Sequence, residues 1–147
     1  MEPYAKIIIF VIGYALRSVA FYFLFDKAEE KSYKALIPFV RYHTLFKICW
    51  HTAYFYPYIV LSLISRVLNY YVNILIEGDY SLALVVFSLV YLAVTIVLLI
   101  LSIKLSIRMG RAFSRSNRFI IGLVLLPTVF LYILTFSKKS KYIGAQE

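Results

Sequence analysis

The chain has 147 residues, of which 63% are hydrophobic and 16% are charged, and its formal net charge is +9. Soluble domains are usually about 45–50% apolar and about 25% charged, so this composition excludes a disordered chain and an ordinary soluble enzyme. The single cysteine excludes a disulfide framework within the chain. The basic residues lie mostly between apolar segments, where they indicate membrane topology and contact with anionic lipid rather than nucleic-acid binding.

Four segments are apolar enough to form membrane-spanning helices, which need about 20 mostly apolar residues each. They predict helices over about residues 4–25, 52–76, 80–108 and 119–136. Helix is the expected conformation because the bilayer core offers backbone groups no water as a hydrogen-bond partner. The sequence therefore predicts an all-α membrane protein with four transmembrane helices, folded as one integral-membrane domain over residues 1–147.

The segment over residues 35–50 is apolar but carries Pro38, Arg41, His43 and Lys47. It is too short and too charged for a spanning helix. We expect it to form an amphipathic helix in the membrane interface, or a shallow re-entrant segment that turns at Pro38.

The distribution of Lys and Arg predicts the orientation, because cytoplasmic links are enriched in both. The link after the first helix carries Lys27, Lys31, Lys34, Arg41 and Lys47. The link after the third helix carries Lys104, Arg108, Arg111, Arg115 and Arg118. The turn over residues 77–79 carries none. With four spans, both termini are expected outside, which also places Lys138, Lys139 and Lys141 outside, against the trend.

Two arginines, Arg17 and Arg66, lie inside expected spans, where a cation costs about 2.5–3.5 kcal/mol on insertion scales. The acidic residues all lie in links or tails: Glu2, Asp26, Glu29, Glu30, Glu77, Asp79 and Glu147. Each arginine therefore has to snorkel to an interface, attract a lipid phosphate or meet a carboxylate of another protein. Arg17 lies about 12 Å of helix from Phe25, so we expect it to snorkel.

Arg66 belongs to a polar stripe with Ser62, Asn69 and Asn73, whose spacing of four, three and four residues places them on one helical face. Ser65 widens the stripe. A polar stripe does not face lipid tails. It either forms hydrogen bonds inside the helix bundle, or binds an anionic headgroup, or docks on another membrane protein.

A second periodic set is basic: Lys104, Arg108, Arg111, Arg115 and Arg118. Its spacing predicts that the third helix continues beyond the membrane with a basic face. This face either lies solvated among lipid headgroups or binds phospholipid or an acidic protein surface. On the same segment Ser102, Ser106 and Gly110 form a ridge of small residues that allows close helix packing.

Catalytic and metal-binding patterns are weak. Cys49 lies near His43 and His51, but residues 49 and 51 point to different sides of a helix and no acid orients a base. The two histidines lack a supporting carboxylate, so we expect no metal site and no cofactor. The sequence predicts a protein that is not an enzyme.

Two stretches of the chain resemble a known family. They are KSYKALIPF with LFKI (residues 31–39 and 45–48), and RAF, GLVLLP and SKYIG (residues 111–113, 122–127 and 140–144). They are similar to small bacterial polytopic membrane proteins of unknown function, which occur alone or joined to a type I signal peptidase module. The resemblance implies the bacterial cytoplasmic membrane. Val40, Arg41 and His43 depart from the Tyr-Asn-x-Tyr-like run of that family, and the catalytic serine and lysine motifs of the peptidase are absent.

Because the chain lacks catalytic groups and carries an uncompensated Arg66, we expect a non-catalytic accessory subunit that docks on a larger membrane complex for transport, secretion or processing. Besides the lipid bilayer, the expected partner is another integral-membrane protein. One alternative is a protein that binds anionic phospholipid or another amphiphile through Arg17 and Arg66. Another is an immunity or regulatory protein against a membrane-active peptide.

Overall fold

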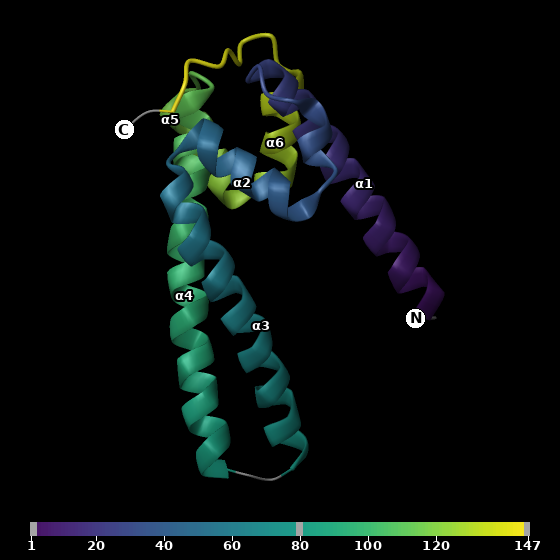
Figure 1. Ribbon diagram of the computed structural model, residues 1–147, viewed down its shortest axis with the longest axis vertical. Coiled ribbons are helices and arrows are strands. Elements are labelled where there is room, and N and C mark those ends of the chain that lie inside the picture. Colours follow the sequence, from purple (N-terminus) through teal and green to yellow (C-terminus); the bar gives the residue numbers. More distant parts are fainter. Residues whose placement is uncertain (1–2, 79–80, 146–147) are drawn as a thin grey trace. The chain divides into compact units, whose positions relative to one another are not determined.

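The computed structural model describes residues 3–78 and 81–145, with the side chain of Ser81 left out. These residues form helices and connecting segments without any β-strand (Figure 1). The helices are α1 (Pro3–Lys27), η1 (Ser32–Ala35), α2 (Pro38–Cys49), η2 (Thr52–Tyr54), α3 (Phe55–Glu77), α4 (Ser81–Ala112), α5 (Asn117–Leu125) and α6 (Pro127–Phe136). The chain packs as two compact units, the first from residues 1–52 and 105–147 and the second from residues 53–104.

Three helical segments within the described residues are long and apolar enough to cross a membrane: Pro3–Lys27, Thr52–Glu77 and Leu82–Ala112. They match the first three helices that the sequence predicts. The third extends further than expected, since α4 ends at Ala112. The expected segment over residues 35–50 contains η1 and the 12-residue helix α2, which at about 18 Å is too short to span the bilayer.

The expectation of a single helix over residues 119–136 is wrong. The helix breaks at Leu126, whose φ of −130° and ψ of 68° are not helical. The cause is Pro127, because a proline ring disfavours the helical conformation of the residue before it and supplies no N–H group. The two products, α5 and α6, have 9 and 10 residues. Each is only about 15 Å long, half the thickness of the hydrocarbon core.

The two short helices α5 and α6 pack against each other as a hairpin (Figure 1). Gly122 on α5 faces the ring of Phe130 on α6 so closely that a Cβ atom at this position would overlap with it. The rings of Phe119 and Phe130 also meet edge to face, with centroids 5.1 Å apart. Gly110 at the end of α4 faces Ile120 of α5 in the same way, as expected for a ridge of small residues.

The first unit is assembled around the C-terminal half of α1. On one side, Tyr14 donates its hydroxyl hydrogen bond to the main-chain oxygen of Leu36, 2.7 Å away, just before α2 begins. Tyr14 lies 13 residues before Lys27, which is about 20 Å along the helix. The link after α1 therefore returns along α1 before α2 starts at Pro38.

The helix α6 packs on α1 and runs parallel to it. Thr135 donates a hydrogen bond to the main-chain oxygen of Ala20, 3.2 Å away. At the end of both helices, Lys27 Nζ donates to the main-chain oxygens of Leu134 (3.1 Å) and Ser137 (2.8 Å). Lys27 thereby satisfies carbonyl groups that a helix C-terminus leaves without partners.

The C-terminal tail is folded back on the first unit. Tyr142 donates to the main-chain oxygen of Ile48 at the end of α2, 2.9 Å away. The main-chain N–H of Ile143 donates to the oxygen of Ala112 at the end of α4, 2.8 Å away. The ring of Tyr142 packs on that of Phe113, with centroids 5.3 Å apart. The tail therefore lies at the end of this unit where α2 and α4 also end.

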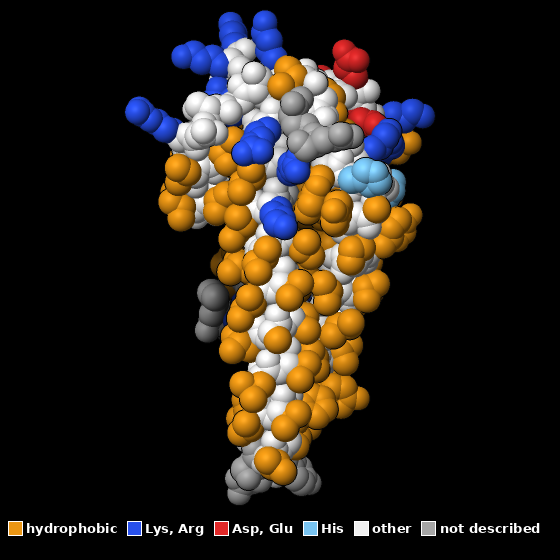
Figure 2. All heavy atoms as spheres, turned by 90° about the vertical axis from the view of Figure 1, so that its left-hand side faces the viewer, with side chains coloured by type: hydrophobic (Ala, Val, Ile, Leu, Met, Phe, Trp, Pro, Cys, Tyr) orange, Lys and Arg blue, Asp and Glu red, His pale blue; other side chains and the backbone are white. Residues whose placement is uncertain are grey.

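The second unit is the hairpin of α3 with α4 as far as Lys104. No described residue of α3 is buried. The two helices meet along a narrow seam, where Tyr71 lies beside Phe87 with ring centroids 6.0 Å apart. Hydrophobic side chains cover the face of the hairpin drawn in Figure 2. In a bilayer these surfaces would face lipid tails or the helices of another protein.

Candidate functional site

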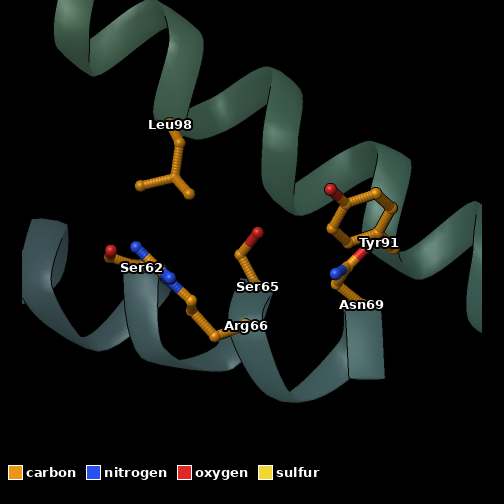
Figure 3. A pocket seen from close by; sticks show the side chains of 6 residues that line it. All are labelled: Ser62, Ser65, Arg66, Asn69, Tyr91 and Leu98. Carbon is orange, nitrogen blue, oxygen red and sulfur yellow. The ribbon is translucent and has the colours of Figure 1, made fainter. Parts of the chain in front are cut away.

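The hairpin of α3 and α4 contains an open polar groove with a volume of about 270 Å³. Its walls are Ser62, Ser65, Arg66 and Asn69 from α3 and Tyr91 and Leu98 from α4 (Figure 3). The four residues of α3 recur at intervals of three, one and three, so they share one face of the helix. The groove places hydroxyl, amide and guanidinium groups in a segment that is otherwise apolar.

Most of the polar stripe predicted from the sequence lines this groove. Ser62, Arg66 and Asn69 lie in its wall together with Ser65. Asn73 does not, because its side-chain amide donates to the main-chain oxygen of Asn69, 2.8 Å away on its own helix. In Figure 3 the Arg66 side chain extends along α3 toward Ser62, while Ser65 points toward α4.

Arg66 carries the only formal charge among the groove residues. It lies 11 residues from each end of α3, about 16 Å in either direction. Its side chain is exposed, and within the described residues it has neither a hydrogen bond nor an ion pair. Asp79 lies outside the described residues. In a bilayer a cation in the middle of a spanning helix would need a partner, and the described residues of this hairpin supply none.

Arg17 belongs to the first unit, so it is not part of the groove. The expectation that it snorkels to a membrane interface stays a prediction. Its guanidinium donates to the hydroxyl of Thr128, in the first turn of α6, at 3.3 Å. Its partner is thus a neutral oxygen supplied by the hairpin of α5 and α6, which hydropathy alone does not predict.

The expected basic face is divided between three elements. Lys104, Arg108 and Arg111 lie on α4, but the helix ends at Ala112. Arg115 lies in the following turn, with its guanidinium 4.0 Å from the centre of the Phe119 ring. Arg118 is exposed on α5. The expectation of one continuous helical face is therefore wrong for Arg115 and Arg118, since the chain turns at Ser114, whose φ is 55°.

Arg41 is a buried charge that sequence reasoning counted only as a topology signal. Its side chain on α2 is 5% exposed. Its only hydrogen bond within the described residues is a long one, 3.4 Å from Nη1 to the hydroxyl oxygen of Ser18. The rings of Tyr14, Phe21 and Tyr42 surround the guanidinium, with centroids 5.1, 5.2 and 5.5 Å away. The sequence signal is the spacing of residues 14, 18 and 21, which share one face of α1.

Cys49 is fully buried at the end of α2. Burial raises the pKa of its thiol well above its ordinary value, which disfavours the thiolate that nucleophilic catalysis needs. In the part of the chain that the structure describes, no three His, Cys, Asp or Glu side chains are grouped as metal ligands would be.

One family model matches residues 33–145, from η1 to the C-terminal tail, and its description is "Family of unknown function (DUF5684)". The match includes the groove, Arg41, the hairpin of α5 and α6, and Tyr142. No curated protein and no solved structure matches the chain.

Proposed function

This chain belongs to the family of unknown function DUF5684, and we propose that it is a non-catalytic membrane subunit that docks on a larger membrane complex through the groove of α3 and α4. The observation that carries the proposal is Arg66, an uncompensated cation at the midpoint of a long apolar helix. Transport machinery or secretion and processing machinery is the proposed host. Secretion and processing machinery is suggested by the resemblance to domains joined to type I signal peptidase.

The depth of Arg66 favours a protein partner over a lipid headgroup. The hydrocarbon core is about 30 Å thick, so the middle of a spanning helix lies about 15 Å from either headgroup layer. Snorkelling serves arginines near helix ends, and the 11 residues on each side of Arg66 exclude that position. A carboxylate on a partner helix at the same depth would compensate the charge where it is.

The chemistry of the groove also disfavours a symmetric pair of identical chains. A twofold contact through this face would set Arg66 against the Arg66 of the second copy, with no acidic residue on the stripe to separate them. The neighbouring hydroxyl and amide groups suit hydrogen bonds between helices, each worth about 0.6 kcal/mol on average in membrane proteins. The proposed partner is therefore a different helix that carries Asp or Glu.

One second candidate is supported by the groove volume. A space of about 270 Å³, walled by a cation, two serines and an asparagine, could receive the polar end of an anionic amphiphile. This would be a lipid or amphiphile binder rather than a docking subunit. The two candidates differ in what stays bound during purification.

We also propose the bacterial cytoplasmic membrane as the location, with the N-terminus outside and the C-terminus in the cytoplasm. This replaces the expectation that both termini lie outside, which required a fourth span. The tail contacts the ends of α2 and α4, so Lys138, Lys139 and Lys141 lie at the same end of the first unit as Lys27 and Lys47. With three spans the orientation agrees with the positive-inside tendency.

The experiment that tests the docking proposal is extraction of the chain from its native membrane in mild detergent, followed by mass spectrometry of co-purifying proteins and lipids. We expect a stoichiometric membrane protein with an acidic residue inside a span. Arg66→Leu should remove it without reducing membrane insertion, whereas the matched exchange Arg118→Leu, outside the groove, should retain it. Unchanged co-purification with Arg66→Leu would contradict the proposal, and retained anionic lipid lost only in that variant would favour the second candidate.

A further inference from the structure

Arg41 is a buried charged group with few hydrogen-bond partners in the described part of the first unit. A guanidinium has five N–H donors, and within the described residues that of Arg41 has one long hydrogen bond, to Ser18. Its Nε is buried without any acceptor. Both carboxylate oxygens of Glu30 are already engaged, one by Lys34 and the other by Lys47. Within the described residues, Arg41 therefore retains unpaired N–H donors and a positive charge that no carboxylate neutralises.

The aromatic rings around Arg41 do not replace an anion. Tyr14, Phe21 and Tyr42 attract the cation through their ring faces, at 5.1 to 5.5 Å. Ring attraction leaves the N–H groups in the guanidinium plane without acceptors, and a buried charge is costly unless hydrogen bonds satisfy those groups. The rings therefore enclose the cation without supplying acceptors for its N–H groups.

The backbone around Arg41 adds positive potential. Arg41 lies in the first turn of α2, which begins with Pro38 and has no side-chain cap. Helix N-termini carry a partial positive charge, so an arginine here increases the local potential. A second uncapped N-terminus, that of α6, lies at Thr128, which accepts the hydrogen bond from Arg17. Arg17 directly precedes Ser18 on α1, so a second cationic residue lies next in sequence to the side chain that Arg41 contacts.

We propose that Arg41 is the receptor of an oxyanion-binding site between α1 and α2, and that its ligand is a phosphate group. Two parallel N–H groups of a guanidinium can donate to two oxygens of one phosphate. An anion with a single acceptor atom cannot accept both hydrogen bonds in this geometry. The N-terminus of α2 favours the same charge. The phosphate could belong to an anionic lipid or be free in solution, and the recognition chemistry is the same in both cases. This site lies in the first unit and does not depend on the docking proposed for Arg66.

The test measures the thermal unfolding of the full-length, delipidated protein in a neutral detergent. One arm adds inorganic phosphate over a potassium gluconate control of equal ionic strength. The other arm adds phosphatidylglycerol over an equal amount of phosphatidylcholine. Because a ligand that binds only the folded state raises its stability, we expect a rise in the melting temperature in at least one arm. A rise with inorganic phosphate identifies a free anion, and a rise with phosphatidylglycerol alone identifies a lipid.

Two variants connect the shift to Arg41. Arg41→Met removes the charge but keeps an apolar chain of similar length, and it should abolish the ligand-dependent shift. Arg111→Met, on the exposed surface of α4 in the same unit, changes the net charge equally and should keep the shift. Without ligand, Arg41→Met should melt at the same or a higher temperature, because it removes an uncompensated buried charge. If the role of Arg41 were only to pack between rings, this variant would melt lower in every condition.

The proposal fails if neither phosphate source shifts the unfolding of the wild-type protein, or if Arg41→Met keeps the full shift. Should Arg41→Met not fold, Arg41→Lys takes its place, since it keeps the charge but loses the planar fork. A phosphate affinity at least tenfold weaker in Arg41→Lys than in the wild type supports the site. An unchanged affinity overturns it.

Discussion

Tyr142, five residues from the C-terminus, donates a hydrogen bond to the main-chain oxygen of Ile48, 94 positions earlier in the chain and 2.9 Å away. The acceptor lies at the C-terminal end of α2, where carbonyl groups have no partner within the helix. The last segment of the chain thus completes a helix formed near its beginning. This gives the SKYIG stretch, noticed as part of the family resemblance, a structural role.

Removing this hydrogen bond should destabilise the first unit. Tyr142→Phe keeps the ring contact with Phe113 but leaves the oxygen of Ile48 without its donor, so we expect a loss of about 1 kcal/mol in the free energy of unfolding. The measurement is thermal unfolding in detergent. Tyr56→Phe, at an exposed position on α3, is the matched control and should be neutral. Equal melting temperatures for both variants would show that the bond contributes nothing.

The hairpin of α5 and α6 should be sensitive to any side chain at residue 122. In Gly122→Ala the new methyl group would overlap with the ring of Phe130, and overpacking of this kind costs about 1–3 kcal/mol. Adding Phe130→Leu should restore part of the loss. Gly13→Ala, where a Cβ meets nothing within 4 Å, should be neutral or slightly stabilising. If residue 122 behaves like residue 13, the two helices do not pack as described.

The link between α1 and α2 should weaken in acid. Hydrogen bonds from Lys34 and Lys47 lower the pKa of the Glu30 carboxyl from its ordinary 4.5 to about 2. A carboxyl with a lowered folded-state pKa contributes stability that is fully present above pH 4.5 and is lost as the pH falls toward 2. The two pairs together should contribute about 1 kcal/mol, since pairs at a surface are weak.

Unfolding of the wild type and of Glu30→Gln across this pH range measures the effect. The variant should be less stable at neutral pH and should show a flatter acid limb. Glu29→Gln, at the exposed neighbouring position, is the control and should follow the wild type. An identical acid limb in all three proteins would exclude a contribution from Glu30.

The proposed three-span topology makes a prediction for fusions at the C-terminus and after the turn between α3 and α4. A fluorescent protein at the C-terminus should be bright, because this reporter folds in the cytoplasm, and alkaline phosphatase there should be inactive. Alkaline phosphatase fused after the turn between α3 and α4 should be active, because the proposed topology places that turn outside. An inactive fusion would place the turn in the cytoplasm. An active C-terminal phosphatase would restore the four-span topology.

The parts of the fold that follow from local sequence were predictable. The long apolar runs of α1, α3 and α4 specify helices by length alone, and the four-three spacing around Arg66 specifies one face. Pro127 indicated a possible kink, but the hairpin was not expected, because hydropathy averages over this proline and does not distinguish a kinked span from a hairpin. Whether Pro127 produces a kink or a hairpin depends on the packing of Gly122 against Phe130. This packing is a property of two segments together.

The environment of Arg41 could not be predicted for a similar reason. Its position in a basic link suggested a solvated topology signal, and only the return of the link along α1 buries it against Ser18 and Tyr14. The partner of Arg17 likewise depends on where α6 lies. Residues whose role is set by packing between separate segments, 22 to 111 positions apart here, leave little trace in a single sequence.

The contact of Lys27 with α6 has a consequence for how this chain can vary. Lys27 binds main-chain oxygens of Leu134 and Ser137, so exchanging either side chain leaves the acceptors in place. Inserting or deleting one residue between Pro127 and Leu134 would instead shift the acceptors by about 1.5 Å and rotate them by a quarter turn or more. The chain should therefore tolerate changes of residue type at these positions, yet keep the length of α6 fixed.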